Sequence, residues 1–584
     1  MYRAVVISIL YALVLGNAYN IEVEVKQGKL LGTREQTVFD EKLYFAFYSV
    51  PYAQSPIGKL RFKDPKSPRK WEHPLDARTE YHGACAQSHI AHKHGLYGHE
   101  DCLHLNIYTP SIHKSGRIAK AAIVWFHGYA FASSFSHIYG PDFFIDNDVI
   151  FITATHRIGA FGFLKLNDTD SHANMGLKDI VMALKWIRRN IDQFGGNKNN
   201  ITVMGSGSAA TYLTLLLATK QSKLFAKMIL QSGTRFASPL FQGDSVLERN
   251  KLERNLKLRG YKNILTAPAK DIVEMSKKVY TRIDLMNTQR NVVPFLPIFE
   301  IKSNKSLLTK HTAKYLENLN VESKPMLIGF NTQESISEII PILRNPQHLK
   351  LFAVRFMFMV PFSGGCKYKH TSQTYSKLAD KIKSRYFKEV ISEKSIEDFL
   401  RYTSDLIKYP IYHFIQEYLK INGSRMFVYK FNYNGNLNAV KATSITGVNF
   451  KVRGAASGDE ICYLMRCEPI WENYVKVNRE KNKDRSFIKQ ITELWANFAK
   501  FGDPTPTTYK GNVTWPPTTI KDDNVLYLSR VIKLIDSSSP NFDTSTFKCS
   551  YIDKGPIWIS PVALSLCSRV FSVKLQLCPL YTLS

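Results

Sequence analysis

The sequence predicts an α/β fold built on a large, mostly parallel β-sheet with helices on both faces. Apolar runs at residues 123–128 and 150–155 have the length and composition of buried strands. Apolar residues recur at helical spacing over residues 174–191. Residues 201–210 pass from β-prone side chains to small ones, and a helix-like apolar run follows at Tyr212–Ala218. Strands that alternate with helices in this way are typical of a parallel sheet.

The beginning of the chain predicts a signal peptide over residues 1–18. Arg3 precedes an apolar run from Ala4 to Leu15, and Gly16-Asn17-Ala18 has the small-x-small pattern of a cleavage site. The run is about a dozen residues long, whereas a membrane-spanning helix needs ~20. We therefore expect a secreted, extracellular chain without a membrane span.

The body of the chain is expected to form one large domain over residues 19–553. The 584 residues contain no composition break, linker or internal repeat in this stretch. Its first segment, residues 21–35, alternates apolar and polar side chains, which predicts an edge hairpin with one solvated face. Residues 554–584 form a tail whose structure the sequence does not indicate. Arg569 and Lys574 interrupt its apolar run, so neither a membrane span nor a glycolipid-anchor tail is expected.

Cysteines and glycosylation motifs agree with export. Cys85 and Cys102 bracket a short loop and are the best-supported disulfide, because paired cysteines are common in secreted chains. The pairing of the other six is left open: Cys366, Cys462, Cys467, Cys549, Cys567 and Cys578. Five asparagines begin an Asn-x-Ser/Thr motif and are glycosylation candidates: Asn167, Asn200, Asn304, Asn422 and Asn512.

The chain is strongly basic. Its 78 Lys and Arg against 49 Asp and Glu give a net charge of +29, and residues 343–453 alone hold 19 basic and 7 acidic residues. One interpretation is a solvated face that keeps the protein soluble. The other is a surface that attracts an anionic partner, either a sulfated glycan or an acidic protein. Nucleic acid is not expected as a partner, because the chain is exported and contains no nucleic-acid-binding motif.

Several ordered blocks resemble the type B carboxylesterase/cholinesterase family, whose fold is the α/β-hydrolase. They are YSVPYAQSPIGKLRF at 48–62, EDCLHLNIYTP at 100–110, IVWFHG at 123–128, HRIGAFGFL at 156–164, LQSG at 230–233, IGFN at 328–331, WANFAKFGDP at 495–504 and CSYID at 549–553. The resemblance covers roughly residues 21–553. It implies a Ser-His-Glu triad and backbone N–H donors for an oxyanion.

Two of the three triad positions depart from the family pattern. The nucleophile position in VMGSGSA at 203–209 corresponds to Gly207, which has no side chain. The acid position resembles Glu334 and is intact, with a buried acceptor role expected for it. The histidine position in GAASGDE at 454–460 corresponds to Ser457, whose hydroxyl is no general base near neutral pH.

The loop that would supply the oxyanion donors is altered as well. HGYAF at 127–131 resembles His-Gly-Gly-Gly-Phe, with Tyr129 and Ala130 at the second and third glycine positions. Ser208, directly after Gly207, is the third oxyanion-equivalent residue. Ser206 and Ser208 flank Gly207, and both are expected to project away from the point at which Gly207 aims.

These departures predict a secreted, catalytically inactive carboxylesterase-like protein that acts by binding an extracellular protein or a sulfated glycan. One alternative is a noncatalytic carrier of an apolar ester or lipid in the residual gorge. The other is a weak or unusual carboxylic ester hydrolase. No cofactor and no metal are expected. Binding of choline esters is doubtful, since no Trp lies between Cys85 and Cys102.

Overall fold

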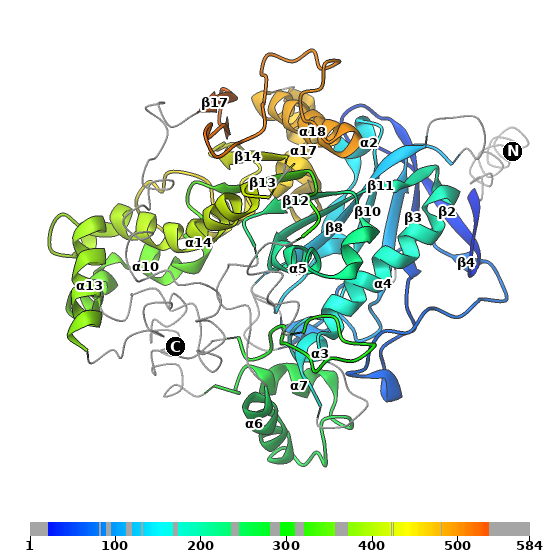
Figure 1. Ribbon diagram of the computed structural model, residues 1–584, viewed down its shortest axis with the longest axis horizontal. Coiled ribbons are helices and arrows are strands. Elements are labelled where there is room, and N and C mark those ends of the chain that lie inside the picture. Colours follow the sequence, from blue (N-terminus) through cyan, green and yellow to red (C-terminus); the bar gives the residue numbers. More distant parts are fainter. Residues whose placement is uncertain are drawn as a thin grey trace, which may run out of the picture.

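A single mixed β-sheet runs through the structure, a computed structural model (Figure 1). The structure describes residues 21–80, 83–88, 95–112, 119–129, 132–166, 173–234, 245–280, 293–309, 321–356, 372–421, 423, 425–480 and 482–535. The predicted signal peptide at 1–18 and the tail at 554–584 lie outside these ranges, as do Cys366, Cys549, Cys567 and Cys578.

The sheet has 13 strands within the described residues, in the order β1-β2-β3-β7-β10-β8-β11-β12-β13-β14-β16-β17, with β4 beside β2. The strands are β1 Ile21–Val25, β2 Gly28–Gln36, β3 Leu43–Pro51, β4 Leu75–Asp76, β7 His104–Thr109, β8 Lys120–Gly128, β10 Ile150–Ala154, β11 Gly196–Gly207, β12 Lys227–Gln231, β13 Met326–Asn331, β14 Met426–Phe431, β16 Val525–Leu528 and β17 Lys533–Ile535. Two short pairs lie outside it: β5 Gln87–Ser88 with β6 Leu96–Tyr97, and β9 Tyr139–Gly140 with β15 Arg466–Cys467.

The seven strands from β10 to β16 are parallel, and antiparallel strands complete both edges. The predicted α/β class is therefore confirmed. The edge hairpin expected at residues 21–35 is also present, because β1 and β2 pair antiparallel from Ile21 opposite Gly32 to Val25 opposite Gly28.

Each face of the sheet is covered by helices, as predicted. The helices are α2 Asp142–Asp146, α3 Gly159–Phe163, α4 Met175–Asn190, α5 Ser208–Leu216, α6 Val246–Lys257, α7 Ala269–Ser276, α10 Ile340–Arg344, α11 Leu349–Arg355, α13 Gln373–Tyr386, α14 Ile396–Leu419, α15 Ala439–Ser444, α16 Ile461–Leu464, α17 Trp471–Glu480 and α18 Lys483–Phe501. Helices α4 and α5 pack on one face and α18 on the other, where α2 lies against it (Figure 1).

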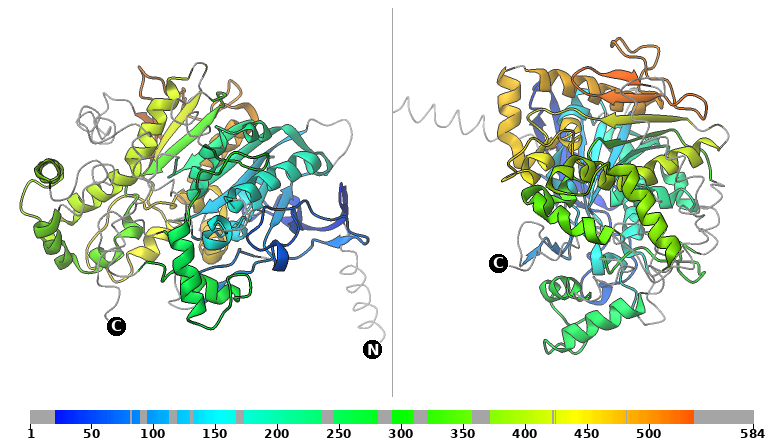
Figure 2. Two further views of the ribbon diagram at one scale, coloured as in Figure 1. Left: turned by 60° about the horizontal axis from the view of Figure 1, so that its bottom comes forward. Right: turned by 90° about the vertical axis from the view of Figure 1, so that its left-hand side faces the viewer.

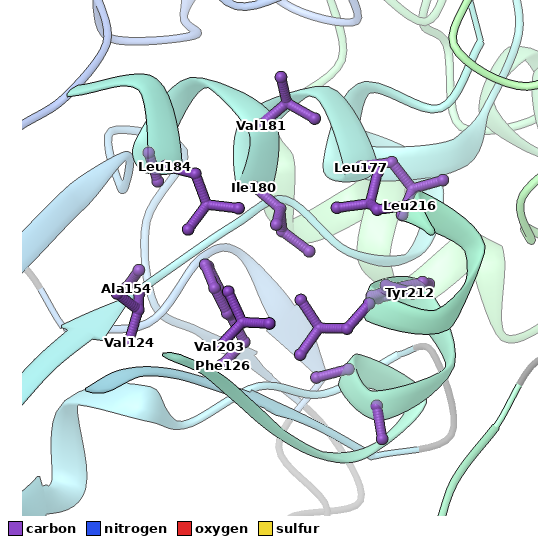
Figure 3. Close-up of a cluster of buried hydrophobic side chains, with 14 of the residues drawn as sticks. Val124, Phe126, Ala154, Leu177, Ile180, Val181, Leu184, Val203, Tyr212 and Leu216 are labelled. Atoms are coloured by element: carbon purple, nitrogen blue, oxygen red, sulfur yellow. The ribbon is translucent and has the colours of Figure 1, made fainter. Parts of the chain in front are cut away.

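Alternation along the strands divides the core between the two faces. In β8, Val124 and Phe126 join the cluster under α4 and α5, whereas Trp125 joins the cluster under α18. Figure 3 shows the first cluster, in which strand and helix side chains meet: Val124, Phe126, Ala154, Leu177, Ile180, Val181, Leu184, Val203, Tyr212 and Leu216. A pleated strand sends successive side chains to opposite faces, so one apolar run supplies both cores.

A buried ion pair fixes the loop after β10 to α4. Arg157 Nε and Nη2 donate to the two carboxylate oxygens of Asp179, each at 2.7 Å, and the Arg157 N–H donates to Asp179 Oδ2 at 3.1 Å. The side chains are 3% and 0% exposed. Arg157 Nη1 also donates to the carbonyl oxygen of Lys63 at 2.8 Å. The pair is thus bidentate and fully enclosed.

Helices farther from the sheet form two outlying groups. Helices α6 and α7 pack on each other beside α3, and α13 lies at another end of the molecule, next to α14 (Figures 1 and 2). Disulfides join Cys85 to Cys102 and Cys462 to Cys467. Among the described residues, no helix is both long and apolar enough to cross a membrane.

Candidate functional site

Gly207 occupies a sharp turn between β11 and α5. Its φ of 58° and ψ of −123° place it in a region that L side chains rarely adopt, and Ser208 begins the helix immediately afterwards. The strand, turn and helix predicted from the sequence are all present. Because β11 lies in the parallel centre of the sheet, this turn stands at the carboxyl end of the strands, where α/β proteins bind their ligands.

A side chain at position 207 has no room in this structure. A Cβ atom built on Gly207 would lie 2.4 Å from the carbonyl oxygen of Gly128. The pairing of β8 with β11 continues to these two glycines, which brings the loop after β8 down onto the turn. The backbone conformation and the neighbouring carbonyl therefore both favour glycine at position 207.

We expect the substitution Gly207→Ala to lower the free energy of unfolding more than Gly260→Ala. Gly260 also has a positive φ, 90°, but no atom lies within 4 Å of the Cβ that alanine would add. Both variants suffer backbone strain of about 1–3 kcal/mol, and only Gly207→Ala adds the steric contact with Gly128. Urea unfolding of the two variants measures the difference. Equal losses would show that position 207 has space for a side chain.

Glu334 lies beside this turn and is fully buried. It follows β13 by three residues, and its Oε1 accepts hydrogen bonds from the Ser232 hydroxyl at 2.7 Å and from the Asn331 N–H at 2.7 Å. Burial raises the pKa of Glu334, while Ser457, Asn331 and Ser232 lower it, in that order. Gly233, directly after Ser232, packs against the carbonyl of Gly207, so these bonds connect the carboxyl to the turn.

Ser457 stands on the segment that runs alongside Glu334. Gln333 forms a bridge with Ala456, and the Gln333 N–H donates to the carbonyl of Ala455 at 2.9 Å. The Ser457 hydroxyl is near enough to Glu334 to lower the pKa of the carboxyl. No described group makes a hydrogen bond of ordinary geometry to Glu334 Oε2. Ser457 is half-buried, in contrast to Ser206 and Ser208, which are 6% and 5% exposed.

A second buried carboxyl, Glu460, lies close to Glu334. It accepts from Gln231 Nε2 at 3.0 Å and from Asn331 Nδ2 at 2.7 Å. Burial and the charge of Glu334 raise its pKa to about 8, so Glu460 is mainly protonated at neutral pH. No role for Glu460 or Ser232 could be predicted from the sequence, although both lie inside family-like blocks. The hydrogen bonds of Glu460 and Ser232 join segments that are at least 99 residues apart in sequence. Contacts between such distant segments cannot be predicted from the spacing of residues in a motif.

The raised pKa of Glu460 predicts a pH dependence of stability. A carboxyl with a higher pKa in the folded state gives stability that is complete below its ordinary pKa and is lost as the pH rises through about 8. We therefore expect the melting temperature to fall less between pH 5 and pH 9 in Glu460→Gln than in the unmodified protein. Thermal unfolding across this range checks the prediction, and parallel curves for the two proteins would contradict it.

The loop after β8 makes its own hydrogen bonds. The Tyr129 N–H donates to the carbonyl of Ser133 at 2.8 Å, and the Tyr129 hydroxyl donates to Glu338 Oε1 at 2.5 Å. Ala130 lies outside the described residues. The remaining oxyanion-equivalent residue, Ser208, is the first residue of α5, whose opening N–H groups lack partners within the helix.

Of the two histidines described near the site, His127 is half-buried and His156 is buried. His127 Nδ1 accepts from the Phe135 N–H at 3.1 Å, and burial lowers the pKa of His127 to about 4. His156 packs between the rings of Phe126 and Tyr212, and burial lowers its pKa to about 3. Within the described part of the chain, no three His, Cys, Asp or Glu side chains are grouped as a metal ion would need.

The predicted glycosylation positions differ in exposure. Asn304 and Asn512 are exposed. Asn200 Nδ2 instead donates to the carbonyl of Lys500 at 3.1 Å, and its Oδ1 accepts from Lys227. Asn167 and Asn422 lie outside the described residues. Glycosylation stays a prediction, with Asn304 and Asn512 the most accessible of the described positions.

Comparisons with known proteins agree on one class. The model of the Carboxylesterase family matches residues 20–542. Juvenile hormone esterase of Tribolium castaneum is 27% identical over 517 residues, which cover 84% of this chain and 85% of that protein. Venom carboxylesterase-6 of Apis mellifera is 27% identical over 501 residues, 84% of this chain and 86% of that protein.

A solved structure shares the fold. The crystal structure of juvenile hormone esterase from Manduca sexta, with OTFP covalently attached, gives a TM-score of 0.75 at 23% identity. The match covers 91% of this chain and 99% of that one. Together with the family match, it confirms the predicted α/β-hydrolase fold.

These comparisons contradict the prediction of a catalytically inactive protein that acts only by binding or as a carrier. The matching family is a family of carboxylesterases, and the proteins named above are esterases. The prediction rested on the combined loss of two triad members, at Gly207 and at Ser457. It did not consider that the hydroxyl at position 457 lies beside a buried carboxyl with a raised pKa.

Proposed function

Because the chain belongs to the carboxylesterase family, we propose that it hydrolyses carboxylic esters, with Ser457 as the nucleophile and Glu334 as the base. The observation that carries this proposal is that the segment holding Ser457 runs alongside the one holding Glu334, with Gln333 bridged to Ala456. The lowering of the Glu334 pKa by Ser457 agrees with this placement. In this proposal, positions 207 and 457 do not hold the serine and the histidine of the family triad. A hydroxyl paired directly with a carboxylate takes their place.

Accessibility favours Ser457 over the serines that flank the turn. An ester must reach the attacking oxygen, and Ser206 and Ser208 are both buried whereas Ser457 is half-buried. The base is also oriented by its neighbours, as nucleophilic catalysis requires. The Ser232 hydroxyl and the Asn331 N–H both hold Oε1 of Glu334, and Oε2 keeps no ordinary hydrogen bond from the described residues.

The raised pKa of Glu334 suits the role of a base. A carboxylate whose pKa lies nearer the working pH accepts a proton more readily than one at the ordinary value. Catalytic hydrogen bonds are often long before substrate binds and tighten in the complex. We expect the Ser457 hydroxyl and the Glu334 carboxylate to come within hydrogen-bond distance in this way.

The proposed reaction proceeds through an acyl-enzyme. Ser457 Oγ attacks the ester carbonyl carbon while its proton moves to Glu334, and a tetrahedral intermediate forms. The intermediate collapses as the carbon–oxygen bond to the alcohol breaks, and Glu334 returns the proton to the leaving alcohol. Water then repeats both steps on the acyl group and releases the carboxylic acid. In this proposal, the N–H groups at the start of α5, which have no partners within the helix, donate to the oxyanion.

The substrate class and the location follow from the relatives and from the chain. Relatives named juvenile hormone esterase and venom carboxylesterase support a carboxylic ester as the substrate. We propose that the protein is secreted. The predicted signal peptide at 1–18, the two disulfides and the exposed sequons at Asn304 and Asn512 support this location.

The purified protein should turn over p-nitrophenyl acetate, a small activated ester. We expect the rate of nitrophenol release to saturate with ester concentration and to rise in proportion to enzyme concentration. Heat denaturation of the protein should abolish this release. Release at the rate of the buffer, or a rate equal to that of the denatured protein, would overturn the proposed function.

A further inference from the structure

We propose that the exposed face of α13 binds a linear sulfated polysaccharide. This inference is independent of ester hydrolysis, because α13 lies at the end of the molecule, away from the parallel centre of the sheet (Figures 1 and 2). Helix α13 also lies within residues 343–453, the stretch in which basic residues outnumber acidic ones.

Three cations form a row along this helix. Lys377, Lys381 and Arg385 are spaced by four residues, so they lie on one side of α13 about 6 Å apart along its axis. All three are exposed. Lys388, just after the helix, is exposed too and extends the basic stretch by three residues. A row of this kind matches a linear polyanion, whose charges also recur at short, regular intervals.

The row is short of neutralising partners. Among the described residues, none of Lys377, Lys381 and Arg385 forms an ion pair, although pairs are present nearby, such as Lys350 with Glu393 at 3.3 Å. Helix α13 holds four basic residues and one acidic residue, Asp380. The described residues from 340 to 401 hold ten Lys or Arg and five Asp or Glu. The positive potential of this end is therefore not cancelled locally.

The chemistry of the face favours a sulfated polysaccharide over a membrane. A helix that binds a lipid surface pairs its cations with large apolar side chains that enter the bilayer boundary. None of the exposed large hydrophobic side chains in the described part of the chain lies on α13. Sulfate groups need only cations, and lysine and arginine both bind them.

The test is heparin-affinity chromatography of the full-length protein and of two triple variants with the same net charge. One variant carries Lys377→Gln, Lys381→Gln and Arg385→Gln. The matched control carries Arg254→Gln, Lys257→Gln and Lys277→Gln, three exposed cations on and beside α6 and α7. A sulfopropyl cation exchanger, run in parallel, reports the loss of net charge alone. Binding of the same proteins to vesicles containing phosphatidylserine tests whether α13 binds a membrane instead.

We expect the α13 variant to elute from heparin at lower NaCl than the control, while both shift equally on the exchanger. The slope of log affinity against log salt should fall in magnitude by about 2–3 in the α13 variant, as for lost contacts to other polyanions. Equal elution of the two variants from heparin would overturn the proposal. The proposal would also be overturned if the α13 variant lost binding to vesicles but eluted from heparin like the control. That result would show that α13 binds lipid.

Discussion

Replacement of Ser457 by Ala is expected to lower kcat/KM for p-nitrophenyl acetate by about 10²–10⁴-fold, the range that nucleophile and base groups contribute. Glu334→Gln should cause a loss of the same order, because the amide cannot accept the proton from Ser457. The double variant should be no worse than either single one, since the two groups act as a unit. These losses are measured with initial rates on purified proteins.

Controls separate chemistry from folding in this series. Ser384 is exposed on α13, and Ser384→Ala should leave the rate within about two-fold, because surface changes have small effects. The unmodified enzyme should also lose kcat/KM as the pH falls, with an apparent pKa above the ordinary value for glutamate, because burial raises the pKa of Glu334. Full activity in Ser457→Ala would exclude this serine as the nucleophile.

Loss of the buried carboxylate of Asp179 is expected to give the largest effect on stability. Asp179→Ala leaves the Arg157 guanidinium buried without its partner, and breaking such a pair typically costs about 3–5 kcal/mol. Arg157 is 3% exposed, so water solvates little of its guanidinium in the folded state. Urea unfolding should therefore show a much lower midpoint for this variant.

An exposed pair of the same type supplies the comparison. Asp76 and Arg78 form an ion pair at 2.7 Å with side chains 42% and 43% exposed. Asp76→Ala should lower the free energy of unfolding by less than about 1 kcal/mol, because surface pairs contribute little. Similar losses in Asp179→Ala and Asp76→Ala would show that the Arg157 loop adjusts and solvates its charge.

Most of the fold could be predicted from the sequence because its signals are local. Residues 123–128, 150–155 and 174–191 carry strand and helix patterns within a few residues, and β8, β10 and α4 form at those places. The turn at Gly207 was predicted for the same reason, as small residues between a strand and a helix. The edge hairpin of β1 and β2 was predicted too, whereas the order of the strands in the sheet needed the structure, since it depends on partners distant in sequence.

The site was predictable only in part, because its contacts are made in three dimensions. The position of Glu334 followed from the motif, but its partner Ser232 lies 102 residues away and its neighbour Ser457 lies on another segment. The prediction of inactivity was drawn from Gly207 and Ser457 together, and the match to a family of esterases contradicts it. The residue type at one position does not reveal which carboxyl will lie beside it.

The most direct test of Ser457 as the nucleophile is covalent labelling with a fluorophosphonate, which reacts with activated serines. The purified protein is treated with the reagent, digested, and its peptides are mapped by mass spectrometry. We predict that the adduct is found on Ser457 and that Glu334→Gln abolishes it. An adduct on Ser206 or Ser208, or no adduct on any serine of the folded protein, would contradict the proposed nucleophile.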